Sequence, residues 1–170
     1  AVLDKKPDLV FISFGTNDSA IDMAKYVPIA DYKANLSYYI DECESIGAKV
    51  IINIPPPVVD SIYLTRHDAA AFEPYGGPNG IVSLYAEARE VAREKGVLYA
   101  DQNAFFKSTY DYTVYFPDGV HPSDTGYKLY ADNVAPVFEK VWLGDVDLSG
   151  EVDQIDYILV KRSCFNTVSL

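Results

Sequence analysis

The sequence predicts an α/β fold in which a parallel sheet lies between two layers of helices. Two continuous apolar runs, DLVFISF at 8–14 and AKVIINI at 48–54, are typical of strands that are buried on both faces. A shorter run, VLYA at 97–100, predicts a third strand. Because a helical pattern follows each run, the strands should be joined by right-handed crossovers and should therefore be parallel.

Each expected helix combines an apolar face with a signal at one end. The first should bury Tyr32, Leu36, Tyr39, Ile40, Cys43 and Ile46 and should stop at Gly47. After a long loop through 73–80, the second should bury Leu84, Tyr85, Ala88, Val91 and Ala92 and should stop at Gly96. The last helix, which Ser123 can cap, carries Tyr127, Tyr130, Val134, Phe138 and Val141.

The composition and the charge narrow the class of protein. With 170 residues, of which 49% are hydrophobic, the chain is long and apolar enough for one ordinary domain with a small appendage. A formal net charge of -11 argues against nucleic acid as a partner, because phosphates require a basic surface. No run approaches the roughly 18–20 apolar residues that span a bilayer, so we expect no membrane insertion. The chain also opens without a recognisable secretory signal.

Two polar clusters follow predicted strands. GTND at 15–18 comes directly after the first strand, and DGVHP at 118–122 follows the third strand through a loop. The carboxyl ends of parallel strands meet at one edge of a sheet, which is where such folds bind their ligands. We therefore expect the two clusters to lie close together at that edge.

Asp118 and His121 have the spacing of an orienting acid and a general base. The carboxylate would hold one ring nitrogen and leave the other to take a proton from a hydroxyl. The alternative is a turn aspartate followed by a surface histidine. The other histidine, His67, lies in the polar stretch LTRHDAAAF and is expected to be exposed or part of a lid.

The GTND cluster offers a complementary function. Asn17 could donate its side-chain amide to a developing oxyanion, while Gly15 allows a close approach of the backbone. The alternative is a turn in which Asn17 and Asp18 only satisfy backbone groups. The presence of both clusters at one edge favours the catalytic interpretation.

The three segments VFISFGTND, NIPPP and DGVHPSDTGY resemble those of the SGNH hydrolases, also called GDSL-type esterases and lipases. The similarity covers about residues 7–142 and is greatest to bacterial carbohydrate esterases that deacetylate plant polysaccharides. It implies a three-layer, flavodoxin-like α/β/α fold and ester hydrolysis without a metal or another cofactor. It also implies that Asn17 and Gly15 belong to the oxyanion hole and that Asp118 and His121 are the acid and base of a triad.

The chain departs from this family at the nucleophile. It has neither the family's glycine-aspartate-serine motif nor the further oxyanion glycine, so the nucleophile is unknown. Ser13, Ser19 and Ser123 are candidates to replace it, although none has the sequence context of the family's nucleophile, and of these Ser19 and Ser123 are favoured because they flank the matching motifs. In the family two more strands precede the strand that corresponds to 8–14. Without them, the strand at 8–14 lies at the edge of a truncated sheet, where its unpaired N–H and C=O groups favour association with another strand. We therefore expect a homodimer through residues 8–14, or a separate N-terminal piece that fills the gap.

An acidic tail starts near Gly144, so the chain divides into a partial hydrolase domain, 1–142, and a second unit, 143–170. In the second unit, the spacing of the acidic and hydroxyl side chains matches that of the ligands in a calcium-binding EF-hand loop with a turn at Gly150. The candidate ligands are Asp145, Asp147, Ser149, the Glu151 carbonyl, Asp153 and Asp156. The loop and the following helix resemble one dockerin repeat, which implies secretion and, if a second repeat completes the module, binding to a cohesin scaffold. The alternative is a solvated acidic tail.

Three hypotheses for function remain at this point. The first is an SGNH-type esterase that acts on acetylated carbohydrate. The second is a non-catalytic dimerising fragment with a calcium-binding tail. The third is a module that binds acetylated sugar without cleaving it.

Overall fold

A sheet of three parallel strands runs through the centre of the molecule. The structure is a computed structural model that describes residues 2–142. The strands β1 (Leu9–Ser13), β2 (Lys49–Ile54) and β3 (Leu98–Asp101) lie in the spatial order β1-β2-β3, and both neighbouring pairs are parallel. The three strands expected from the sequence are therefore confirmed, with ends that differ by at most one residue.

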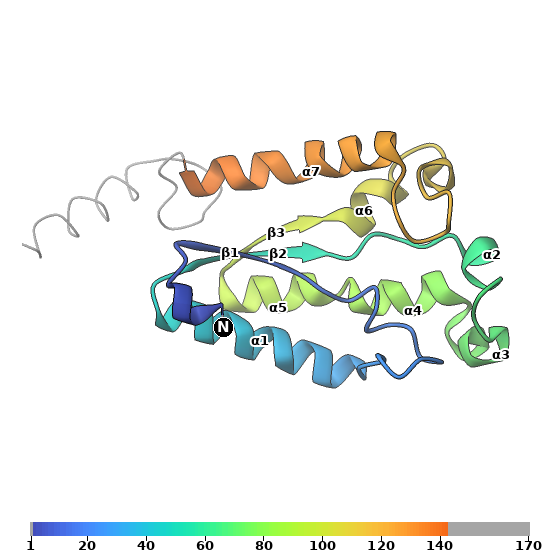
Figure 1. Cartoon of the computed structure of the whole chain (residues 1–170), viewed down its shortest axis with the longest axis horizontal. Coiled ribbons are helices and arrows are strands. Elements are labelled where there is room, and N and C mark those ends of the chain that lie inside the picture. The colour runs from blue at the N-terminus through green and yellow to red at the C-terminus, as the bar shows by residue number, and fades with distance from the viewer. Residues whose placement is uncertain (1, 143–170) are drawn as a thin grey trace, which may run out of the picture.

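Helices cover both faces of this sheet (Figure 1). One face is covered by α1 (Ile29–Ser45), α4 (Pro78–Tyr85) and α5 (Ala88–Lys95). The opposite face is covered by α6 (Gln102–Lys107) and α7 (Asp124–Trp142). The three-layer α/β/α architecture is thus confirmed for the described part of the chain. None of the helices in that part is long and apolar enough to cross a membrane.

Short helical turns fill several connections between these elements. They are η1 (Leu3–Lys5), α2 (Asp60–Tyr63), α3 (Ala69–Phe72), η2 (Glu73–Tyr75) and η3 (Tyr112–Tyr115). Three of the five lie between β2 and α4, where the sequence predicted only a long loop. They matter for the site, because α2 packs against the loop that carries the candidate base.

The two strands expected to be buried on both faces differ in their environment. β2 is central, and all of its residues except Lys49 are buried. In β1 only Ile12 is buried, and Phe11 is 37% exposed, so the prediction of full burial is wrong for this strand. The physical reason is position: β1 pairs only with β2 among the described residues, which leaves its other edge open.

The open edge also changes the buried face of α1. Tyr32, Leu36, Ile40 and Cys43 are buried as predicted, and Gly47 ends the helix with a positive φ of 83°. Tyr39 is 42% exposed, contrary to prediction, and its ring instead lies 6.2 Å from that of the exposed Phe14. Ile46, at the end of the helix, is 36% exposed and was also wrongly expected to be buried.

The helix expected to bury residues between 84 and 92 is broken in the structure. A turn at 86–87 separates α4 from α5, although Tyr85, Ala88 and Val91 are all buried. Leu84 is 36% exposed, so its predicted inward orientation is wrong. The turn changes the direction in which the side chains project, so a helical periodicity counted from α5 does not predict which residues of α4 are buried.

Candidate active site

The GTND segment forms a tight turn directly after β1. The backbone N–H of Gly15 donates to Asp18 Oδ2 at 2.8 Å, and the N–H of Ser19 donates to the Gly15 carbonyl at 3.0 Å. Gly15 has a φ of 116°, and a Cβ there would lie only 2.9 Å from Pro55 Cγ. Only glycine fits this close approach of two loops. Its N–H is used by Asp18, so the role of Gly15 in this structure is to allow the close approach of Pro55 rather than to donate a hydrogen bond.

Asn17 is an exposed residue of this turn. Its Oδ1 accepts a hydrogen bond from Lys25 Nζ at 2.6 Å. Among residues 2–142 its Nδ2 has no hydrogen-bond partner, so both N–H groups are available to a ligand. This is the state that an oxyanion donor requires.

Asp118 and His121 form the predicted pair. The Nδ1–H of His121 donates to Asp118 Oδ2 at 2.7 Å. Asp118 Oδ1 accepts from the backbone N–H groups of Val120, at 2.9 Å, and His121, at 2.7 Å. With Nδ1 engaged in this way, Nε2 is the ring nitrogen left to accept a proton.

The same contacts determine the ionisation of Asp118. Partial burial acts to raise its pKa, but the hydrogen bonds from the His121 ring and from the two backbone N–H groups outweigh burial. The pKa of Asp118 is therefore held well below its usual range. The carboxylate stays charged and can stabilise the positive charge that develops on His121.

The loop that carries Asp118 and His121 is held in place by hydrogen bonds from other segments. The N–H of Val59 donates to the Gly119 carbonyl at 2.9 Å, and Arg66 Nη2 donates to the Asp118 carbonyl at 2.7 Å. Phe116, just before the loop, is fully buried against Phe106, with ring centroids 4.9 Å apart. The orientation of His121 is thus supported by elements far away in the sequence.

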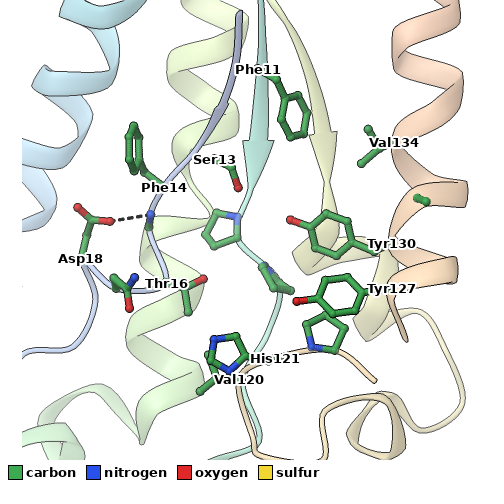
Figure 2. Close-up of a pocket in the computed structure, with 16 residues that line it drawn as sticks. Phe11, Ser13, Phe14, Thr16, Asp18, Val120, His121, Tyr127, Tyr130 and Val134 are labelled. Carbon is green, nitrogen blue, oxygen red and sulfur yellow. Dashed lines mark hydrogen bonds between the residues drawn. The ribbon is translucent and has the colours of Figure 1, made fainter. Parts of the chain in front are cut away.

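Both clusters open into one pocket of about 510 Å³ at the carboxyl end of β1 (Figure 2). Gly15, Asn17 and His121 line this pocket, and Asp118 lies behind His121. The structure therefore brings the four predicted site residues together, as the position of the two clusters at one sheet edge indicated.

The three serines considered as nucleophiles have different environments. Ser19 is fully buried and donates to the Thr16 carbonyl at 2.8 Å. Ser123 Oγ caps α7 by accepting from the N–H of Gly126 at 3.2 Å, which confirms its predicted capping role. Both hydroxyls are therefore used structurally, and neither is hydrogen-bonded to His121.

Ser13 is the serine of the three that lines the pocket (Figure 2). Its Oγ accepts from Asn53 Nδ2 at 2.9 Å. In residues 2–142 no serine hydroxyl is hydrogen-bonded to His121. The nucleophile therefore remains unidentified within the described residues.

A buried polar network next to Ser13 was missed by the sequence analysis. Asn53, which is 1% exposed, also donates to the hydroxyl of Tyr130, and the buried Gln102 donates to Asn53 Oδ1 at 3.4 Å. Burial raises the pKa of Tyr130. One signal was present in the sequence: Asn53 is a single polar residue in an otherwise apolar strand.

His67 is not the exposed or lid residue that the sequence predicted. Its side chain is 8% exposed, stacks on Tyr63 with ring centroids 4.0 Å apart, and has Nδ1 2.8 Å from Asp22 Oδ1. Asp22 also accepts from the N–H of Asp68 at 2.9 Å. His67 therefore ties the loop after β1 to the segment between α2 and α3.

The predicted calcium ligands, Asp145 to Asp156, lie outside the described residues. Within 2–142 no group of three or more His, Cys, Asp or Glu side chains is arranged to hold a metal ion.

Comparison with known proteins agrees with this geometry. The model of the GDSL-like Lipase/Acylhydrolase family matches residues 1–129, a range that contains both polar clusters. The chain belongs to this family. Its members include esterases, and the resemblance to hydrolases expected from the sequence is therefore confirmed.

Several relatives of this GDSL-family chain have names or known structures. The uncharacterized lipoprotein YqeF of Bacillus subtilis is 36% identical over 109 residues, which are 59% of this chain and 45% of that protein. The isoamyl acetate-hydrolyzing esterase 1 homolog of Mus musculus is 28% identical over 80% of this chain and 57% of its own length. The chain thus spans about half the length of these relatives.

Two solved structures show the same fold. The lipase/acylhydrolase from Enterococcus faecalis superposes with a TM-score of 0.65 at 27% identity, covering 82% of this chain and 64% of that protein. Axe2, an acetylxylan esterase from Geobacillus stearothermophilus, superposes with a TM-score of 0.61 at 22% identity, covering 90% and 64%. At that identity the second likeness concerns the fold alone.

Proposed function

We propose that the protein is a carboxylic ester hydrolase in which His121 is the general base and Asn17 stabilises the oxyanion. The observation that carries this proposal is the pocket itself, which His121 and Asn17 line together while Asp118 holds His121 from behind. Membership of the GDSL-like family supports the same reaction class.

The proposed reaction follows from these contacts. Nε2 of His121 takes the proton from the attacking hydroxyl, and Asp118 stabilises the imidazolium that results. The carbonyl oxygen of the ester becomes an oxyanion, which accepts hydrogen bonds from Nδ2 of Asn17. His121 then returns the proton to the leaving alcohol.

The attacking hydroxyl belongs, in this proposal, to a segment outside the described residues. The open edge of β1 ends beside Gly15, so a parallel strand paired with β1 would also end at the pocket. An N-terminal piece paired in this way could deliver a serine to His121. A second copy paired through 8–14 would cover the same edge and would form the predicted homodimer.

We further propose an acetylated carbohydrate as the substrate. A small acyl group is supported by the mouse relative, whose name describes the hydrolysis of an acetate ester. A polysaccharide is supported by the dockerin-like pattern of 143–170, because dockerins attach enzymes to scaffolds that act on plant cell walls. The same pattern, together with the lipoprotein relative, supports an extracellular location.

Hydrolysis of p-nitrophenyl acetate by the chain, together with the N-terminal piece that supplies the attacking serine, tests the reaction class. We expect His121→Ala to abolish hydrolysis, whereas Tyr110→Ala, a change at a fully exposed position, should leave it intact. Hydrolysis that survived His121→Ala would disprove the assigned base.

One observation favours a second candidate function. Because no described serine is bonded to His121, the chain could hold an acetylated sugar without cleaving it. Absence of hydrolysis with the N-terminal piece present, together with calorimetric binding of an acetylated xylo-oligosaccharide, would support this binding module over the enzyme. Absence of both would support the non-catalytic fragment.

The tail carries a separate prediction. With oxygen ligands at Asp145, Asp147, Asp153 and Asp156, we expect calcium to bind and to raise the midpoint of thermal unfolding. Calorimetric titration at millimolar calcium measures this, with Asp147→Ala and Asp156→Ala as the variants that should lose the heat. Absence of heat in the unaltered chain would refute the calcium loop. Binding to a cohesin would in addition require the second repeat of a complete dockerin.

A further inference from the structure

We propose that Lys25 is a positioning residue that orients and polarises the side-chain amide of Asn17. The proposal rests on the proposed function, because it concerns the oxyanion donor of that reaction. It adds a cation that acts through Asn17 without touching the substrate.

The contact determines which way the amide points. An ammonium group has three donors and no acceptor, so only the oxygen of an amide can face it. Lys25 Nζ lies 2.6 Å from Asn17 Oδ1, and the reversed amide would place its NH₂ group against a positive charge. Lys25 therefore forces Nδ2 away from itself, and this is the atom without a partner among residues 2–142.

The fold of the loop brings these two residues together. The N–H of Ala20 donates to the Asn17 carbonyl at 3.2 Å, and the N–H of Val27 donates to the Asp18 carbonyl at 3.0 Å. The chain thus turns back on itself, and a lysine eight residues further on reaches the amide. Asp22, within the same loop, is bound to His67, which ties the loop to the rest of the molecule.

Lys25 bonds to an amide oxygen, although the chain is rich in carboxylates that could pair with a lysine. The sequence contains 25 aspartate and glutamate residues and only 14 lysine and arginine residues. Lys25 nevertheless forms no ion pair with a carboxylate in the described part of the chain, whereas Lys33 and Lys95 do. An unpaired cation on the amide oxygen is well suited to a site where negative charge develops.

The chemical effect follows from amide resonance. A charge-assisted hydrogen bond to Oδ1 draws electron density toward the oxygen and strengthens the double-bond character of the C–N bond. The N–H groups become more acidic and donate more strongly to an oxyanion. The stronger hydrogen bonds from Asn17 stabilise the transition state, in which the ester oxygen carries negative charge, more than they stabilise the neutral ester.

Nuclear magnetic resonance of the chain tests the contact without any need for activity. The Asn17 side-chain amide is assigned as the NH₂ pair that disappears in Asn17→Ser. In Lys25→Met we expect this pair to move toward the chemical shifts of solvent-exposed asparagines and its two protons to exchange places faster. Lys25→Arg, which keeps the charge, should restore both values. Lys49→Met, at an exposed position at the start of β2, is the matched control and should change neither.

Kinetics distinguish this proposal from the proposed function. Where the ester is hydrolysed, we expect Lys25→Met to lower kcat about tenfold with KM unchanged, a smaller loss than the roughly 10²–10³-fold loss on removal of a donor itself. Unchanged Asn17 resonances in Lys25→Met would overturn the proposal, as would a higher KM with kcat unchanged. Absence of ester hydrolysis even with the N-terminal piece and its serine present would refute the proposed function, while the resonances would still decide the role of Lys25.

Discussion

At the scale of single residues, Asp118 performs two tasks with one carboxylate. Oδ1 accepts the two backbone N–H groups that form the turn, and Oδ2 holds the ring of His121. The turn and the orientation of the proposed base, His121, are therefore built by different oxygens. Substitutions that keep one oxygen and replace the other can separate the two tasks.

Asp118→Asn should keep the turn and lose the function. The amide oxygen can still accept the backbone N–H groups, but an NH₂ group in place of Oδ2 favours the wrong tautomer of His121. We expect hydrolysis to fall by about 10⁴-fold, as in other triads with this change, while the fold is retained. Asp118→Ala should in addition lower the free energy of unfolding by about 1 kcal/mol, because the turn loses its acceptor. Full hydrolysis by Asp118→Asn would contradict the assigned acid.

The pH dependence of stability gives a second measurement on the same variant. Because the folded-state pKa of Asp118 is lowered, its contribution is fully present above its unfolded-state pKa of about 3.9. The contribution is lost as the pH falls from there toward the folded-state value. The difference in unfolding free energy between the unaltered chain and Asp118→Asn should therefore shrink below about pH 4 in urea titrations. A difference that grew in acid would have the wrong sign.

At the scale of elements, the site depends on how the loop before α7 is held. The start of α7 is capped by Ser123, and the preceding loop packs on α2 through Gly119. Neither contact touches a substrate. Both keep His121 in position relative to the turn after β1.

Ser123→Ala should cost about 1 kcal/mol of stability, the usual loss of an N-cap. Ser123→Asn should restore most of this loss, because asparagine is also a good N-cap residue. Urea unfolding measures both variants. Retention of hydrolysis in Ser123→Asn would exclude Ser123 as the nucleophile, whereas complete loss of hydrolysis with the stability restored would assign the attacking hydroxyl to Ser123 instead of to a segment outside residues 2–142.

Gly119→Ala tests the packing of the loop on α2. Gly119 has a φ of 84°, and a Cβ there would lie 3.0 Å from both Ile62 Cβ and the backbone nitrogen of Tyr63. Gly47→Ala is the matched control, because Gly47 has a φ of 83° but no neighbour within 4 Å. We expect a loss of about 1 kcal/mol for Gly47→Ala, from backbone strain alone, and about 2–3 kcal/mol for Gly119→Ala. Equal losses would show that the loop moves freely away from α2.

At the scale of the whole molecule, β1 has an edge that no other strand among residues 2–142 pairs with. Beside it, between β1 and α1, lies an apolar groove of about 530 Å³ that Val10, Phe14 and Tyr39 line. Unpaired backbone groups next to exposed aromatic rings favour pairing with another strand. This is the physical basis of the homodimer, or of an added N-terminal piece, in the proposed function.

Light scattering during size exclusion tests the homodimer. We expect the chain to elute as a dimer at high concentration, and Phe14→Lys to shift it toward the monomer because a buried lysine would oppose pairing. Tyr110→Lys, at a fully exposed position, should not change the mass. A monodisperse monomer of the unaltered chain at high concentration would refute both the dimer and the sticky edge.

Local sequence patterns were enough to predict the class of fold and the location of the site. Strands were recognisable because apolar runs end at glycine or proline, and Asp118 and His121 because their turn is local. The positions of Gly15 and Asn17 followed from their place after a strand. Each of these inferences depends on residues that are close together in the chain.

Contacts between distant residues were decided only by the tertiary structure. Three contacts depend on how the loops fold back. They are the stacking of His67 on Tyr63, the hydrogen bond from Asn53 to Tyr130 and the hydrogen bond from Lys25 to Asn17. The exposure of Phe11 and Tyr39 likewise depends on which strand is at the edge. The sequence alone determined which candidate groups lie at the sheet edge. The tertiary structure decided how each is aimed, because hydrogen-bond direction and burial arise from neighbours that no local pattern records.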